Sequence, residues 1–310
     1  MNGYAELLLV DWLAALAPHW RLAMFAALGI VAGLVLDVIV RRVPVAIEQA
    51  WLEEMQSVDP ADLSLTSSSL TSSISGASRH ASSRQADVPT PSATMALAAH
   101  PATHTAPHPA ATPLPAYAEP FTLPVAAPHR RWQLSLLSGV LSLAVAWRFG
   151  PTWQSLGALG LVWTLIALAY IDYDTQLLPD ILTLPLLWAG LLCNLGHWFA
   201  ALPAAVIGAA AGYLSLWALY WVYWWLRRRE GMGFGDFKLY AALGAWFGWT
   251  ALLQVITLAC LLAIVVAGGA WLAGRLRSDQ MFPFGAFLAA AGMITLFGGN
   301  GLMIWIGGTP

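Results

Sequence analysis

The fold class of this 310-residue chain is decided by one stretch, Gly231-Met232-Gly233-Phe234-Gly235-Asp236, which stands between two long apolar runs. Its last residue, Asp236, lies at the mouth of an apolar segment that spans residues 238 to 274. An ionisable side chain at membrane depth is costly, so it indicates a functional site and a partner group. The partner that the sequence offers is Asp172, at the end of another apolar run.

Composition indicates a membrane protein. Apolar residues make up 59% of the chain and charged residues only 10%, which cannot form an ordinary soluble surface. Many of the 17 tryptophans lie near the ends of apolar runs, where indole rings favour the headgroup layer. The net charge of −2 gives no indication of a nucleic-acid partner. The two cysteines, Cys193 and Cys260, lie inside apolar runs and predict neither a disulfide framework nor a metal site.

Apolar runs predict an all-α polytopic membrane protein with about eight transmembrane helices, since one spanning helix needs about 20 residues. The stretch 238 to 274 is too long for one helix and short for two, but Gly248 and Thr250 offer a break. We therefore expect a tight hairpin there. The other predicted spans are residues 21 to 40, 133 to 149, 153 to 172, 181 to 199, 203 to 226 and 284 to 306.

The chain outside these spans predicts two further segments. Residues 1 to 17 lack a basic leader and a small-residue cleavage site, so we expect a short interfacial helix rather than a signal peptide. Residues 57 to 130 are rich in Ser, Ala, Pro, Thr and His and should be disordered, because they cannot bury enough apolar surface. The expected division is an interfacial segment (1–20), a first transmembrane helix (21–44), a largely disordered cytoplasmic loop (45–131) and a transmembrane core (132–310).

Basic residues predict the orientation, because Lys and Arg accumulate in cytoplasmic loops. With eight spans, all of the 14 basic residues except Arg21 and Arg148 fall on one side. The termini then face the periplasm. Asp172 and Asp236 lie at the same, cytoplasmic, membrane face.

Two carboxylates at the same depth in the membrane are the smallest set of side chains that an aspartyl protease needs. Like charges about 3 Å apart cannot both ionise, so the pair holds one proton. The charged acid takes a proton from water, and the neutral acid polarises the scissile carbonyl without a metal. Gly233 and Gly235 permit backbone angles and close approaches that let an extended substrate lie beside Asp236.

These residues also have simpler interpretations. Asp172 could cap a helix end or pair with an arginine, and Asp236 could be the N-cap of its helix. Asp180, just after Pro179, is expected to cap the next helix, although it could instead hold a substrate or orient water. Lys238 could favour ionisation of Asp236 or reach lipid headgroups.

Two blocks of sequence resemble the type IV prepilin peptidases, a family of GxGD aspartyl proteases. They are Gly231-Met232-Gly233-Phe234-Gly235-Asp236-Phe237-Lys238-Leu239 and Ile171-Asp172-Tyr173-Asp174-Thr175-Gln176-Leu177-Leu178-Pro179-Asp180. Two shorter matches are Phe282-Pro283-Phe284-Gly285 and Leu36-Asp37-Val38-Ile39-Val40-Arg41-Arg42-Val43-Pro44.

The resemblance implies removal of leader peptides from prepilins and type II secretion pseudopilins, after the glycine that ends a short basic leader. The reaction would occur at the cytoplasmic side of the bacterial inner membrane, in contact with type IV pilus or type II secretion machinery. Asp172 and Asp236 take the catalytic positions of the family. The supporting motif residues are Gly233, Gly235, Lys238, Asp180 and Pro179.

One departure from the family concerns a second activity. Many members carry two CxxC pairs that bind zinc after the first span, associated with N-methylation from S-adenosylmethionine. This chain has no cysteine there, so no zinc is expected, and S-adenosylmethionine is implied only if methyl transfer is retained. Prolines between His100, His104 and His108 break any helix that would align them as metal ligands.

Three other functions are compatible with buried acids. A presenilin-like or preflagellin-type protease shares the GxGD chemistry but differs in substrate. A transporter could use the two acids as a proton or cation relay, but it predicts inverted repeats, and none is visible. A noncatalytic assembly subunit would tolerate loss of either acid.

Overall fold

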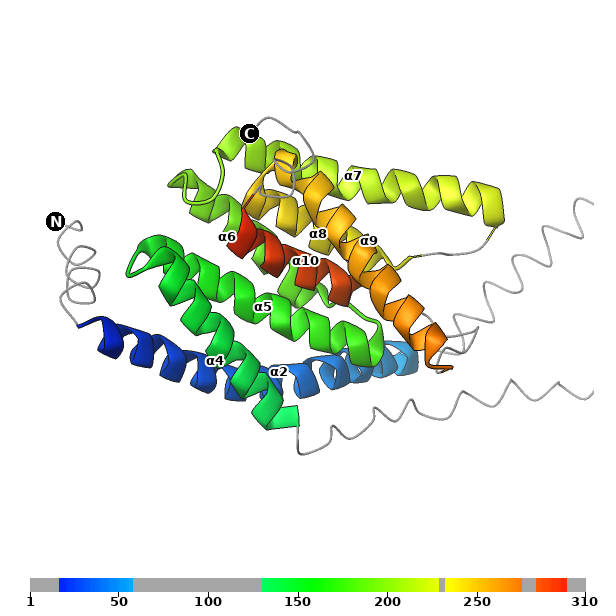
Figure 1. Ribbon diagram of the computed structural model, residues 1–310. Coiled ribbons are helices and arrows are strands. Elements are labelled where there is room, and N and C mark those ends of the chain that lie inside the picture. The colour runs from blue at the N-terminus through cyan, green and yellow to red at the C-terminus, as the bar shows by residue number, and fades with distance from the viewer. Residues whose placement is uncertain (1–16, 58–129, 229–231, 275–282, 300–310) are drawn as a thin grey trace, which may run out of the picture. The chain divides into compact units, whose positions relative to one another are not determined.

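The computed structural model describes residues 17–57, 130–228, 232–274 and 283–299. Within these ranges the chain is helical and contains no strand, which confirms the all-α prediction. The helices are α2 (Pro18–Ser57), α4 (Arg130–Phe149), α5 (Trp153–Thr175), α6 (Asp180–Leu195), α7 (Leu202–Arg227), α8 (Phe234–Phe247), α9 (Trp249–Leu272) and α10 (Phe284–Gly298) (Figure 1). The predicted interfacial helix, apart from its last residue, lies outside the described residues, as do residues 58–129 of the predicted disordered loop and residues 300–306 of the last span.

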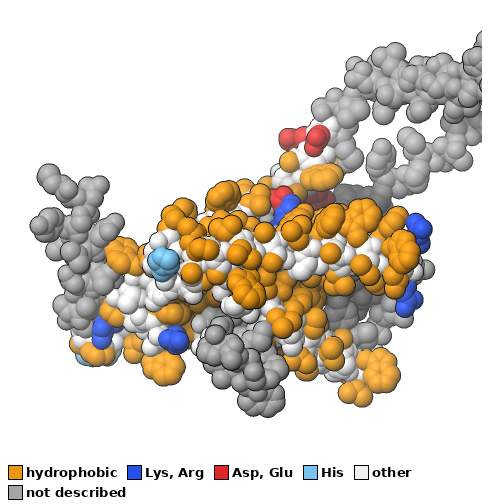
Figure 2. Space-filling model, turned by 90° about the horizontal axis from the view of Figure 1, so that it is seen from above, with side chains coloured by type: hydrophobic (Ala, Val, Ile, Leu, Met, Phe, Trp, Pro, Cys, Tyr) orange, Lys and Arg blue, Asp and Glu red, His pale blue; other side chains and the backbone are white. Residues whose placement is uncertain are grey.

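Helix lengths and apolar character support a polytopic membrane protein. Among the described helices, α2, α5, α7 and α9 are long and apolar enough to cross a membrane. The apolar helices α6 and α10 are shorter, with 16 and 15 residues. Large apolar side chains are widely exposed, among them Trp225, Val265 and Leu272. Figure 2 shows such side chains spread over one face of the molecule, as lipid contact requires.

The first helix is longer than the sequence predicted. Residues 45 to 57 were expected to begin a loop, but α2 continues through Pro44 to Ser57. A proline removes one helical hydrogen bond, and the residues that follow it, such as Ala46, Glu48 and Gln49, are good enough helix formers to continue the helix. The chain divides into two compact units, residues 1–46 with 123–310 and residues 47–122, and only residues 47–57 of the second are described.

The predicted break in the stretch 238 to 274 is confirmed at Gly248. This residue has a φ of 80° and a ψ of 170°, which a residue with a side chain rarely adopts. Its N–H donates to the carbonyl of Gly244 at 2.8 Å, and α9 begins at the next residue. The stretch therefore forms two helices, of 14 and 24 residues.

Helix α8 lies in the interior of the larger unit. Its residues from Asp236 to Trp246 are buried, with the exception of Lys238. Helix α7 crosses it where Gly208 meets the backbone of Gly244 and Gly212 meets that of Tyr240. Small residues let helix backbones approach closely in membranes, so these glycines account for the close crossing of the two helices.

Four helix ends meet at one end of this unit (Figure 1). They are the carboxyl end of α5 and the amino ends of α6, α8 and α10, and contacts among Asp172, Leu178, Gly235 and Gly285 join them. The two acids singled out from the sequence lie on these ends.

Candidate functional site

Asp172 lies in the last turn of α5 and is buried, with 4% of its surface exposed. Its Oδ2 accepts a hydrogen bond of 2.8 Å from the N–H of Ala286, in the first turn of α10. Free N–H groups and the dipole at a helix N-terminus stabilise negative charge. The carboxylate therefore does bind a helix end, as one simpler interpretation expected. That helix is α10, which lies far away in the sequence.

Asp236 is the third residue of α8 and is also buried, with 7% of its surface exposed. The N-cap of α8 is Gly233, so the interpretation of Asp236 as an N-cap is wrong. The N–H of Asp236 donates to the Gly233 carbonyl at 3.2 Å. Its carboxylate lies within electrostatic reach of Asp172, so the structure brings the two acids to one site.

The two motif glycines differ in role. Gly233 has a φ of −75° and a ψ of 146°, an ordinary extended conformation, and a Cβ there would meet no atom within 4 Å. The expectation that it supplies unusual backbone angles is therefore wrong. Gly235 does have a close neighbour, because a Cβ there would lie 2.6 Å from the Cβ of Leu178. The close approach of a substrate at this glycine stays a prediction.

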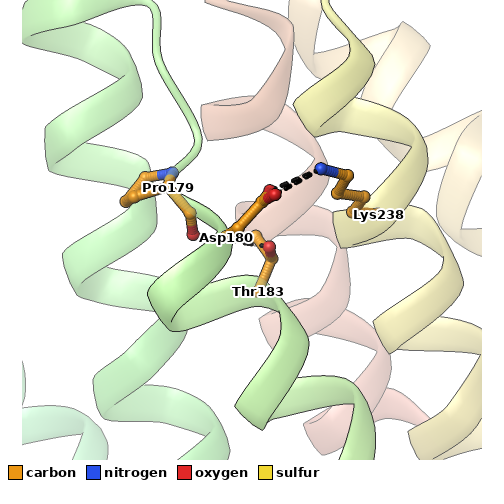
Figure 3. Close-up of polar contacts among 4 residues, drawn as sticks. All are labelled: Pro179, Asp180, Thr183 and Lys238. Carbon is orange, nitrogen blue, oxygen red and sulfur yellow. Dashed lines mark hydrogen bonds and ion pairs between the residues drawn. The ribbon is translucent and has the colours of Figure 1, made fainter. Parts of the chain in front are cut away.

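Asp180 and Lys238 form an ion pair between α6 and α8 (Figure 3). The ammonium of Lys238 donates to both carboxylate oxygens of Asp180 at 2.6 Å. The expectation that Asp180 caps α6 is wrong, because the N-cap is Pro179 and Asp180 is the first helical residue. A negative charge in that first turn remains favourable for the helix dipole.

Pro179 is fixed by the helix that it precedes. Its carbonyl accepts hydrogen bonds from the N–H of Leu182 at 3.0 Å and of Thr183 at 3.1 Å. The hydroxyl of Thr183 donates to the same carbonyl at 3.4 Å. Pro179 therefore sets the path of the turn that enters α6.

Two features of this unit were not assigned a role from the sequence. Leu178, in the turn between α5 and α6, contacts Gly235 and also Gly285, which lies against the carboxylate of Asp172. No sequence signal marks an apolar turn residue of this kind. In α2, Asp37 is buried and accepts a hydrogen bond of 2.9 Å from Nε of Arg41.

Potential metal ligands do not cluster in the described residues. Within the part of the chain that the structure describes, no group of three or more His, Cys, Asp or Glu side chains could hold a metal ion. The histidines His100, His104 and His108 lie outside that part. Cys193 and Cys260 lie in different helices, α6 and α9, so the cysteines of this chain do not fit a tetracysteine zinc module.

The fold and the site together define a polytopic helical membrane protein with two acids buried where four helix ends meet. The type IV leader peptidase family matches residues 159–268, a range that contains both acids. A relative from Burkholderia pseudomallei (strain 1026b), named prepilin leader peptidase/N-methyltransferase, is 40% identical over 295 residues, which is 95% of this chain and 91% of the relative. The chain belongs to the type IV leader peptidase family.

The similarity to other relatives of the same name covers a shorter region. One from Aeromonas hydrophila is 51% identical over 172 residues, 56% of this chain and 59% of the relative. One from Pseudomonas aeruginosa is 46% identical over 176 residues, 56% of this chain and 61% of the relative. No solved structure matches the chain. The transporter alternative is not supported by these similarities.

Proposed function

We propose that this protein is a membrane aspartic endopeptidase that removes the leader peptide of type IV prepilins and type II secretion pseudopilins. Asp172 and Asp236 are its catalytic acids. The observation that carries the proposal is the burial of these two carboxylates at the ends of α5 and α8, which contacts of Leu178 with Gly235 and Gly285 bring together, inside the region that matches the family. Burying an acid among apolar helices is energetically unfavourable, so two such acids together indicate a functional site.

The surroundings of the two acids suggest different tasks. The backbone N–H groups of Ala286 and Gly285, at the N-terminus of α10, stabilise negative charge on Asp172. At Asp236 the backbone of Gly233 has the same effect, but the neighbouring charge of Asp172 opposes it. We therefore assign Asp172 as the base and Asp236 as the acid that holds the shared proton.

Peptide hydrolysis then follows from ordinary acid–base chemistry. Asp172 takes a proton from water, the water oxygen attacks the scissile carbonyl carbon, and Asp236 gives its proton to the carbonyl oxygen. When the tetrahedral intermediate collapses, the C–N bond breaks and Asp172 gives its proton to the leaving amine. Asp236 recovers the proton of the hydroxyl oxygen, so the pair returns to its singly protonated state.

The location of basic residues supports a site that faces the cytoplasm. Helix α7 ends at Arg227, Arg228 follows, and α8 begins at Phe234, so these arginines lie near the same end of the molecule as Asp236. Since arginine accumulates on the cytoplasmic side, we propose the bacterial inner membrane with the site at its cytoplasmic face. The pilus or type II secretion machinery would then receive the product.

N-methylation is the second activity in this proposal. The relatives from Burkholderia pseudomallei and Aeromonas hydrophila are named N-methyltransferases as well as leader peptidases. S-adenosylmethionine would supply the methyl group for the amino terminus that cleavage releases. We assign no residue of the described ranges to this step.

The test is cleavage of a defined peptide by the purified full-length protein in liposomes. The substrate is a synthetic prepilin peptide with its leader and the first apolar residues of the mature pilin, and mass spectrometry reads the products. One cut at the leader boundary supports the proposal, and an added methyl mass in the presence of S-adenosylmethionine supports the second activity. An intact peptide, or cuts at scattered positions, would refute the peptidase assignment.

A further inference from the structure

Leu178 occupies a distinctive place beside the two acids. It belongs to residues 176 to 179, the turn between α5 and α6, and its side chain is partly buried. Its neighbour Leu177 has 53% of its surface exposed. Two adjacent leucines in one turn therefore have different environments, and only Leu178 contacts the site among the contacts that the structure gives.

The walls opposite Leu178 are two glycines. A Cβ at Gly235 would lie 2.6 Å from the Cβ of Leu178, and a Cβ at Gly285 would lie 2.6 Å from its Cδ1. That Cβ at Gly285 would also lie 3.0 Å from Cγ of Asp172, and Gly235 immediately precedes Asp236. The leucine side chain thus fills space between the glycine beside the Asp172 carboxyl group and the glycine that precedes Asp236, at distances where one further carbon atom would clash.

The turn that carries Leu178 is held on both sides. Gln176 has a left-handed conformation, with a φ of 55°, and its N–H donates to the carbonyl of Asp172 at 2.9 Å. On the other side, the Pro179 carbonyl is bound by the first turn of α6. The backbone of the turn that carries Leu178 therefore has a defined position relative to Asp172.

We propose that Leu178 is a specificity-determining residue, which limits the substrate residue on the amino side of the scissile bond to glycine. This inference rests on the proposed function. A scissile carbonyl between Asp172 and Asp236 brings the α-carbon of that residue beside Leu178. Because Gly235 and Gly285 already touch the leucine, a Cβ on the substrate would have to displace it.

The test uses peptides that differ only in the residue before the scissile bond, which is glycine in one and alanine in the other. Full-length wild type, Leu178→Ala, Leu178→Val and the control Leu177→Ala are compared in liposomes for kcat/KM on both peptides. One methylene in a binding pocket is worth about 10-fold to 200-fold in discrimination. The quantity compared is kcat/KM for the glycine peptide divided by kcat/KM for the alanine peptide. Relative to the wild type, we expect this ratio to be lower by about 10-fold or more in Leu178→Ala, lower by less in Leu178→Val, and unchanged in Leu177→Ala.

A ratio is insensitive to the amount of folded enzyme, so a merely structural role of Leu178 would lower both rates and leave their ratio unchanged. That result, or an equal shift in Leu177→Ala, would overturn the inference while leaving the peptidase assignment intact. If Leu178→Ala does not fold, the same ratio is measured with Leu178→Val. Failure of the wild type to cut the glycine peptide would overturn the proposed function, and this inference with it.

Discussion

The ammonium of Lys238 lies 2.6 Å from both carboxylate oxygens of Asp180, a residue 58 positions away in the sequence. The pair joins the first turn of α6 to the second turn of α8 (Figure 3). Asp236 is two residues before Lys238, and Leu178 is two residues before Asp180. The ion pair therefore holds the start of α8 next to the turn that carries Leu178.

We expect loss of this ion pair to affect cleavage more than stability. Both side chains are partly exposed, and such pairs contribute no more than about 1 kcal/mol to the free energy of unfolding. A small misplacement of Asp236, however, can lower kcat by up to about 100-fold. Asp180→Asn and Lys238→Met should each lower kcat by about 10-fold, with a smaller change in KM. Steady-state kinetics and thermal unfolding in detergent measure the two effects.

The control for this prediction is a double-mutant cycle. Asp180→Asn combined with Lys238→Met should cost no more activity than either change alone, because each single change already removes the same interaction. Fully additive losses would contradict a shared function of the pair.

Asn194 should be important for stability. It is fully buried, its amide nitrogen donates to the carbonyls of Ala245 and Trp246, and its Oδ1 accepts from the N–H groups of Phe199 and Ala200. Asn194→Leu would leave buried groups without partners, at about 1–3 kcal/mol each. We expect the free energy of unfolding to fall by about 3 kcal/mol or more, and Leu195→Ala, at an exposed neighbour, to change it little. Equal effects of the two substitutions would argue against this role.

The crossing of α7 and α8 should not tolerate one added methyl group. A Cβ at Gly208 would overlap the backbone of Gly244, whereas a Cβ at Gly268 in α9 would meet no atom within 4 Å. Gly208→Ala should lower the free energy of unfolding by about 1–3 kcal/mol, and Gly268→Ala should leave it unchanged or raise it slightly. Thermal unfolding in one detergent compares them. A stable Gly208→Ala variant would show that the helices separate without cost.

The proposed chemistry requires no metal, because the two carboxyl groups supply both the base and the acid. Incubation with a strong chelator followed by its removal should therefore leave kcat/KM for prepilin cleavage unchanged. A loss of activity that added zinc or magnesium restores would show that a metal takes part in the reaction.

Helix positions were accessible from the sequence, because apolar run length and glycine carry strong local signals. The break at Gly248 was predicted from such signals. The end of α2 was not, since Pro44 weakens a helix without ending it.

Contacts between helices were harder to predict. Asp180 and Lys238 were each assigned local roles from their neighbours in the sequence, but their partner lies in another helix. The position of Leu178 depends on how four helix ends meet, which periodicity does not encode. In contrast, Asp172 and Asp236 could be brought together from topology alone, because counting spans placed both at one membrane face.

The most direct test measures the rate of leader removal by the variants Asp172→Asn and Asp236→Asn. The wild type and Asp174→Asn, a substitution two residues further along α5, serve as controls. Asparagine keeps the size of the side chain and removes its acid–base chemistry. The account predicts that each of the first two variants loses at least about 100-fold in the rate of prepilin cleavage, at unchanged thermal stability, and that Asp174→Asn cleaves at close to the wild-type rate. Near wild-type cleavage by either Asp172→Asn or Asp236→Asn would contradict the aspartyl pair.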